Sequence, residues 1–207
     1  MTPLFRPVGD LVLYLASSSP RRRALLASLG LPFVPLVPQV AEPEPIEGED
    51  PEAYVIRMAT LKGRECASRA HSGTNEVFIA ADTAVCLEKR ILGKPADAAE
   101  ALEMLRFLNG KSHFVVTGVY CSFSNQKEKD ETSFAIRSVV KFARWDESVL
   151  AAYAAIDEPR DKAGAYAIQD SGAFLVEGVM GSWTNVAGLP LDELVKLLIL
   201  KKIIEPI

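Results

Sequence analysis

The sequence predicts an α/β fold in which a mixed, partly antiparallel central sheet is flanked by helices. Apolar runs of strand length alternate with segments of helical periodicity in the N-terminal half, and two longer runs within residues 113–145 have the pattern of paired strands. The 207 residues are 49% hydrophobic and 24% charged, enough to bury roughly 70% of the unfolded surface. No repeat or domain-joining linker interrupts the chain, so residues 1–207 are predicted to form a single domain.

The first predicted unit is a strand followed by a helix. Leu11 to Ala16 is a continuous apolar run of strand length. The helix that follows has Ser19 as its N-cap, Pro20 in its first turn and Gly30 beyond its end. This order places the start of the helix directly after the carboxyl end of a strand.

The next segment predicts a second strand, a long helix and a third strand. Phe33 to Val40 is read as a strand weakened by two prolines, and it leads into an acidic loop from Glu42 to Asp50. A helix capped by Asp50 is predicted to run to about Ala70. The apolar run Val77 to Ala81 then predicts a buried strand with Asp82 and Thr83 at its end.

The rest of the chain adds three helices and several strands, and its middle is predicted to be antiparallel. The helices are predicted over Asp97 to Asn109, Asp146 to Ile156 and Leu191 to Lys202. The strands are predicted over Ala84 to Glu88, Ile91 to Lys94, His113 to Phe123, Thr132 to Trp145, Tyr166 to Gln169 and Ala173 to Val176.

Charge and motif content exclude several classes of function. The net charge of −4 argues against general nucleic-acid binding, which depends on a surplus of Lys and Arg. Three scattered cysteines and two histidines form no disulfide or zinc pattern, and neither G-x-G-x-x-G nor G-x-S-x-G occurs. We find no export signal and no apolar run long enough for a membrane span, so a cytoplasmic protein that binds neither nucleic acid nor membrane is expected.

Three arginines, Arg21, Arg22 and Arg23, fall in the first turn of the first predicted helix. The helix dipole disfavours cations at that end. The conflict is removed if a bound anion meets the free backbone N–H groups, the serine hydroxyls and the guanidinium groups together. The alternative is a solvated helix face on which the arginines extend into water.

Asp82 and Lys62 are further candidates for a site. A carboxylate at a strand end of an open α/β sheet can bind a divalent ion or take a proton from water, although Asp82 could equally cap a turn. Helical projection places Lys62 in the middle of an apolar arc, so it should point inward and need a counter-charge. Glu65, three residues on, is one candidate partner, and a ligand phosphate is another. Lys94 lies between Gly93 and Pro95 in a stiff turn.

These candidates fall within a series of motifs whose order and spacing are highly specific. The series consists of Leu15-Ala-Ser-Ser-Ser-Pro-Arg-Arg22, Glu42, Ala59 to Lys62, Ala81-Asp-Thr83, Gly93-Lys-Pro95, Thr117-Gly118, Asp161-Lys-Ala-Gly-Ala-Tyr-Ala-Ile-Gln169 and Gly181 to Pro190. From about Leu13 to Leu198 the chain resembles the Maf proteins, nucleoside triphosphate pyrophosphatases related in fold to inosine triphosphate pyrophosphatases. That resemblance implies two lobes around a cleft.

The resemblance implies hydrolysis between the α- and β-phosphates of a nucleoside triphosphate, with Mg²⁺ or Mn²⁺ as cofactor. The segment Ala165 to Gln169 resembles the branch that cleaves dTTP and UTP rather than the branch that acts on 7-methyl-GTP. The matching positions make Asp82 the proton acceptor and Glu42 the best second carboxylate near the metal. The positions tied to base choice are Arg21, Thr83 and Gln169, and the polar lining of the phosphate site is Ser17, Ser19, Arg22, Lys62 and Lys94.

Three positions depart from the family pattern. Trp183 replaces an expected tyrosine, Ala41 replaces a common acid, and Asp170 replaces the usual glycine after Gln169. Asp170 bears most on the base pocket, because it adds negative charge and removes the conformational freedom of glycine. Two alternatives therefore remain: a 7-methyl-GTP pyrophosphatase, and a non-catalytic nucleotide-binding regulator of septum formation. A homodimer is common for such folds by family analogy.

Overall fold

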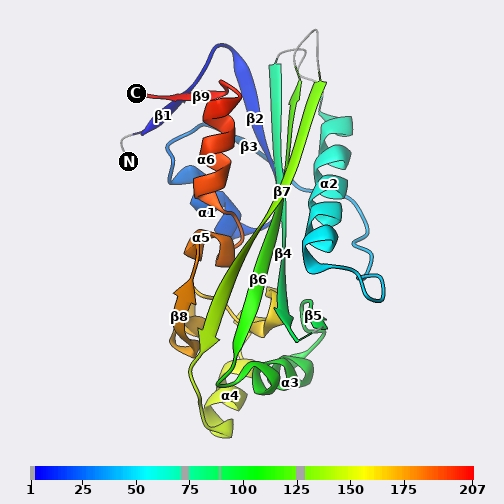
Figure 1. The fold of residues 1–207 in the computed structure, drawn as a ribbon, viewed down its shortest axis with the longest axis vertical. Coiled ribbons are helices and arrows are strands. Elements are labelled where there is room, and N and C mark those ends of the chain that lie inside the picture. The colour runs from blue at the N-terminus through cyan, green and yellow to red at the C-terminus, as the bar shows by residue number, and fades with distance from the viewer. Residues whose placement is uncertain (1–2, 71–74, 89, 125–128) are drawn as a thin grey trace.

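The computed structural model describes residues 3–70, 75–88, 90–124 and 129–207, and it confirms the predicted fold class (Figure 1). A seven-stranded sheet has the order β3-β2-β4-β6-β7-β8, and β5 pairs with β4. The strands are β2 (Leu11–Ala16), β3 (Val34–Leu36), β4 (Asn75–Leu87), β5 (Arg90–Leu92), β6 (Ser112–Ser124), β7 (Lys129–Phe142) and β8 (Val176–Met180). β2 pairs in parallel with β3 and with β4, and the other pairings between the described strands of this sheet are antiparallel, so the sheet is mixed as expected.

Helices flank the long strands of this sheet on two sides and at one end (Figure 1). They are α1 (Pro20–Ala27), α2 (Pro51–Arg69), α3 (Ala98–Leu108), α4 (Glu147–Ala154), α5 (Trp183–Val186) and α6 (Leu191–Leu200). The long strands β4, β6 and β7 run through the whole molecule, with α2 on one side and with α1 and α6 on the other (Figure 1). In the described part of the chain, no helix is both long enough and apolar enough to cross a membrane.

The predicted helix caps Ser19 and Asp50 are confirmed, and Asp97, the first residue of a later predicted helix, is a cap as well. The side chain of Ser19 accepts a hydrogen bond from the N–H of Arg22 and begins α1. Asp50 caps α2 and Asp97 caps α3, each by accepting from backbone N–H groups of the first turn. The local signals for these helices were therefore sufficient to locate their starts.

The prediction that Asp82 ends its strand is wrong, because β4 continues to Leu87. On one edge, β2 pairs with β4 only as far as Ala80, and β5 begins to pair with it at Val85. On the other edge, β6 pairs continuously and keeps the strand extended. Ala81 to Ala84 therefore form a notch, a short stretch of β4 that has no strand neighbour among the described residues on one edge.

The C-terminal third differs most from the prediction. Tyr166 to Gln169 form no strand, because Gly164 and Ala165 before them both have φ values near +60°, which turns the chain. Three short 3₁₀ helices occupy this region, η1 (Glu158–Asp161), η2 (Ala163–Ala165) and η3 (Asp170–Leu175). Two further strands that the sequence did not predict, β1 (Phe5–Pro7) and β9 (Ile204–Pro206), pair antiparallel and bring the chain ends together.

His113 on β6 is almost completely buried against the rings of Phe142 and Tyr166. Its Nε2 lies 2.7 Å from the Tyr166 hydroxyl, and its Nδ1 has no hydrogen-bond partner among the described residues. This burial lowers the pKa of His113 to about 4. The histidine is therefore neutral in the folded protein at neutral pH.

We expect His113 to make the protein less stable in mild acid. The unfolded state, in which the pKa is about 6.5, binds more protons than the folded state between about pH 6.5 and 4, so stability falls as the pH drops through that window. The loss should be about 2 kcal/mol between about pH 7 and pH 5. Urea unfolding at both pH values measures this difference in the free energy of unfolding, and the His113→Gln variant serves as the comparison. An equal pH dependence in the variant and the wild type would contradict this role.

Candidate active site

The notch in β4 opens into a cavity of about 1140 Å³. The start of α1, the turn after β5, the segment from η1 to η2 and the turn after α5 supply its walls. Eight of the residues expected to form the site line it, and they are Ser19, Arg21, Arg22, Glu42, Lys62, Asp82, Thr83 and Lys94. The fold therefore brings together side chains that are far apart in the sequence.

Asp82 and Lys62 form a buried ion pair at the notch. The Nζ of Lys62 lies 2.6 Å from Oδ1 of Asp82 and 2.9 Å from Oε2 of Glu42. Only 7% of Lys62 and 8% of Asp82 are exposed, whereas the Glu42 side chain is about half exposed. Oδ2 of Asp82 makes no hydrogen bond to a described residue, so this oxygen can accept a proton.

The prediction that Lys62 points inward is confirmed, but Glu65 is not its partner. Glu65 instead pairs with Arg69 one turn later on α2, and it accepts a hydrogen bond from the backbone of Gln39. Lys62 is held by carboxylates from β4 and from the loop before α2. A buried ammonium with two carboxylate partners is electrostatically satisfied.

The two arginines at the start of α1 differ in their surroundings. The guanidinium of Arg22 is anchored, since Nε donates to the Gly188 carbonyl at 2.8 Å and Nη2 donates to the Thr83 hydroxyl at 3.0 Å. Arg21 is freer, and its nearest charged partner is Asp161 at 4.0 Å. Burial lowers the pKa of both arginines, but a guanidinium stays charged at neutral pH. Both cations therefore face the cavity.

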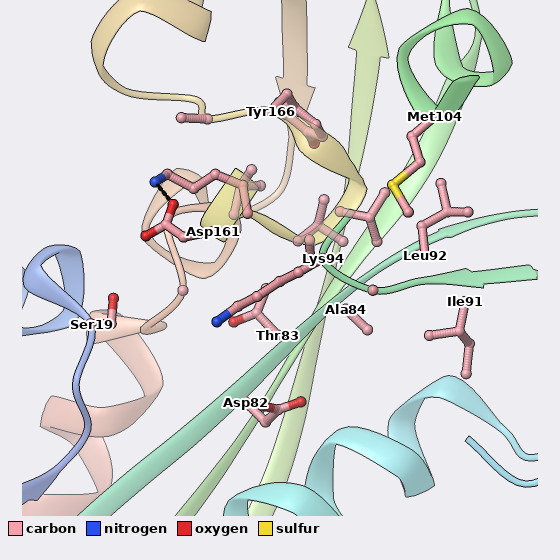
Figure 2. Close-up of a pocket in the computed structure, with 18 of the residues that line it drawn as sticks. Ser19, Asp82, Thr83, Ala84, Ile91, Leu92, Lys94, Met104, Asp161 and Tyr166 are labelled. Atoms are coloured by element: carbon pink, nitrogen blue, oxygen red, sulfur yellow. Dashed lines mark hydrogen bonds and ion pairs between the residues drawn. The ribbon is translucent and has the colours of Figure 1, made fainter. Parts of the chain in front are cut away.

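Figure 2 shows Lys94 extending into the cavity that Thr83 and Asp82 also line. Lys162 also lines the cavity, is only 8% exposed, and forms an ion pair with Asp161. The burial of Lys162 was not predictable from the sequence, because Lys162 lies between two 3₁₀ helices whose packing is tertiary. Together with Arg21, Arg22 and Lys62, these two lysines are five of the cations that line the cavity, and they come from four separate parts of the chain.

Several apolar side chains also line the cavity. Leu92 and Met104 lie on one side of it and Tyr166 on another, away from Asp82 (Figure 2). A lining of this kind can take a ligand that combines a partly apolar group with a polyanion. The volume and the mixture of cationic and apolar side chains suit a nucleotide.

Two expected site residues do not line this cavity. The side chain of Ser17 is buried and accepts a hydrogen bond from the N–H of Ser19, so it shapes the loop before α1. Gln169 is half-buried at the start of η3, outside the lining. Asp170 adopts a φ of +63°, the conformation that glycine would take more easily. Trp183 is half exposed and is also outside the lining.

The carboxylates at the notch fit a divalent cation that is shared with a substrate. Mg²⁺ is commonly held by one or two carboxylates together with substrate phosphates and water. Glu42 and Asp82 place oxygens within 3 Å of the same nitrogen, that of Lys62, so both could lie near one phosphate-bound ion. Over the described residues, no group of three or more His, Cys, Asp or Glu side chains is arranged to hold a metal alone.

Comparison with known proteins identifies the family of the chain. The profile of the family described as Maf-like protein matches residues 12–200. A dTTP/UTP pyrophosphatase of Nitratidesulfovibrio vulgaris is 51% identical over 89% of this chain and 85% of its own length. Another, from Desulfotalea psychrophila, is 44% identical over 94% of this chain and 97% of its own length.

Among solved structures, the Ham1 protein of Staphylococcus aureus is 12% identical, with a TM-score of 0.40 over 91% of this chain and 98% of its own. The profile covers nearly the whole chain and includes the residues around the notch. The chain belongs to the Maf family.

Proposed function

We propose that this protein is a nucleoside triphosphate pyrophosphatase that hydrolyses dTTP and UTP, and modified pyrimidine nucleotides, to the monophosphate and pyrophosphate. The observation that carries the proposal is the buried Asp82 carboxylate, held by Lys62 at the floor of a cavity rich in cations. The names of relatives that are 44–51% identical to the chain support the choice of substrate.

In the proposed reaction one carboxylate acts as the base, and several cations stabilise the negative charge of the phosphates. Oδ2 of Asp82 takes a proton from water, and the oxygen of that water attacks the α-phosphorus. The bond from the α-phosphorus to the bridging oxygen breaks, and pyrophosphate leaves with the bonding electrons. Lys94, Arg21 and Arg22 neutralise the charge that develops on the phosphate oxygens.

Lys62 positions the Asp82 carboxylate and does not itself act as a nucleophile. Its ammonium holds Oδ1 of Asp82, which leaves Oδ2 for the proton. Glu42, together with the substrate phosphates and water, would hold a Mg²⁺ or Mn²⁺ ion. That ion would neutralise more of the charge of the triphosphate. We assign Arg21 and Thr83, which line the cavity, to the choice of base, and Ser19 to the phosphate end. Ser17 acts only by shaping the loop before α1, and Gln169, which lies outside the lining, would act on the base only through its neighbours.

A panel of nucleoside triphosphates assayed for pyrophosphate release tests the proposal. With Mg²⁺ present, we expect kcat/KM for dTTP and UTP to exceed that for 7-methyl-GTP by at least about tenfold, because a larger methylated purine must fit the same pocket. Chelation of the metal should abolish the release. Tight binding of dTTP without turnover would favour a nucleotide-binding regulator. A preference for 7-methyl-GTP would instead assign the protein to the branch of the family that cleaves that nucleotide.

A further inference from the structure

A closed ring of hydrogen bonds lies beside the cavity and is formed by Arg22, Thr83, Thr117, Asn185 and Gly188. Arg22 donates to Thr83, the hydroxyls of Thr83 and Thr117 are 3.0 Å apart, and Thr117 donates to the Asn185 carbonyl at 2.9 Å. Gly188 closes the ring, since its N–H donates to that same carbonyl and its carbonyl accepts from Arg22. The ring joins α1, β4, β6 and the turn after α5.

The chemistry of these groups fixes the direction of every hydrogen bond in the ring. A carbonyl has no hydrogen to give, so the single hydroxyl hydrogen of Thr117 lies toward Asn185. The hydrogen between the two threonines therefore belongs to Thr83. The guanidinium of Arg22 only donates, so Thr83 accepts from it. The hydroxyl of Thr83 consequently has no hydrogen left for a ligand and can offer the cavity only a lone pair.

Burial makes this arrangement rigid. Thr117 and Asn185 are completely buried, so water cannot replace a bond lost there. Thr83 and Arg22 line the cavity, whereas Thr117 does not. Thr117 can therefore act on a ligand only through Thr83.

We infer that Thr117 is a positioning residue that makes Thr83 an obligate hydrogen-bond acceptor toward the substrate. The inference rests on the proposed function and deepens it. An acceptor at this position favours a ring that carries an N–H, as N3 of uracil and thymine does, over cytosine, whose N3 is bare and would face a lone pair. Thr117 thus contributes to the choice between pyrimidines without touching them.

Thr117→Val tests this role, because valine has the same shape but can neither donate nor accept. The freed hydrogen of Thr83 could then turn toward the substrate. We expect kcat/KM for UTP to fall about tenfold and the preference for UTP over CTP to shrink by about the same factor. Thr117→Ser keeps the hydroxyl and should restore both quantities.

Ser138→Ala is the matched control. Its hydroxyl accepts from the side chain of Asn185 and from the backbone of Ser182, so the variant loosens the same turn without freeing the hydrogen of Thr83. It should keep the preference for UTP. In a Thr83→Val background, Thr117→Val should change the preference no further, because the group through which it acts is gone.

The outcomes separate the two proposals. An active wild type whose preference survives Thr117→Val, or is lost equally in Ser138→Ala, overturns the role of Thr117 and leaves the proposed function standing. A lower kcat/KM with an unchanged preference also overturns it, because a merely structural loss would do the same. A wild type that releases pyrophosphate from neither nucleotide overturns the proposed function, and this inference with it.

Discussion

Asp82→Asn is expected to abolish pyrophosphate release while the protein stays folded. Asparagine keeps the size of the side chain and an oxygen that can accept from Lys62, but its amide cannot take a proton from water. Loss of a general base costs typically about 10²- to 10⁴-fold in rate. The measurement is the rate of pyrophosphate release at saturating dTTP, together with a thermal unfolding curve for each protein.

The stability of this variant should change little. Lys62 retains Glu42 as a carboxylate partner at 2.9 Å, so its ammonium is not left unpaired. Glu65→Gln is a suitable control on the same helix, because Glu65 pairs with Arg69 away from the cavity and its loss should leave turnover unchanged. Turnover of the Asp82→Asn protein within about tenfold of the wild type would refute the role of Asp82 as proton acceptor.

The sequence located elements whose signals are local. Ser19, Asp50 and Asp97 mark helix starts because a capping side chain bonds to N–H groups only two or three residues away. The helical periodicity of the apolar residues likewise predicted that Lys62 lies on the buried face of α2. Such features depend on neighbours along the chain, so the sequence contains the information needed to predict them.

Features that depend on distant pairing were not predictable in this way. Whether Asp82 ends a strand depends on where β2 and β5 stop and start along β4, which is a matter of sheet register. The pairing of β1 with β9 joins the two ends of the chain, and its strands are only three residues long. The apolar run at Tyr166 is buried by contact with His113 rather than by strand pairing, so its composition predicted the wrong element.

Gly118→Ala is expected to cause a large loss of stability, although Gly118 does not line the cavity. Gly118 lies in the middle of β6, where α2 crosses the sheet. A Cβ at this position would lie 2.5 Å from the backbone carbonyl of Val55 and 2.7 Å from the backbone nitrogen of Ile56. Because backbone atoms of a helix cannot turn aside as a side chain can, the whole of α2 must shift, at a cost of about 3 kcal/mol or more.

The same shift should also lower activity, because α2 carries Lys62, and the bond from Lys62 to Asp82 tolerates little displacement at 2.6 Å. Urea unfolding gives the change in stability, and pyrophosphate release per folded molecule gives the change in activity. Gly178→Ala on β8 is the control, since a Cβ there would have no heavy atom within 4 Å and should change stability by less than about 0.5 kcal/mol. Equal stability of the two alanine variants would mean that α2 does not pack on β6 through Gly118.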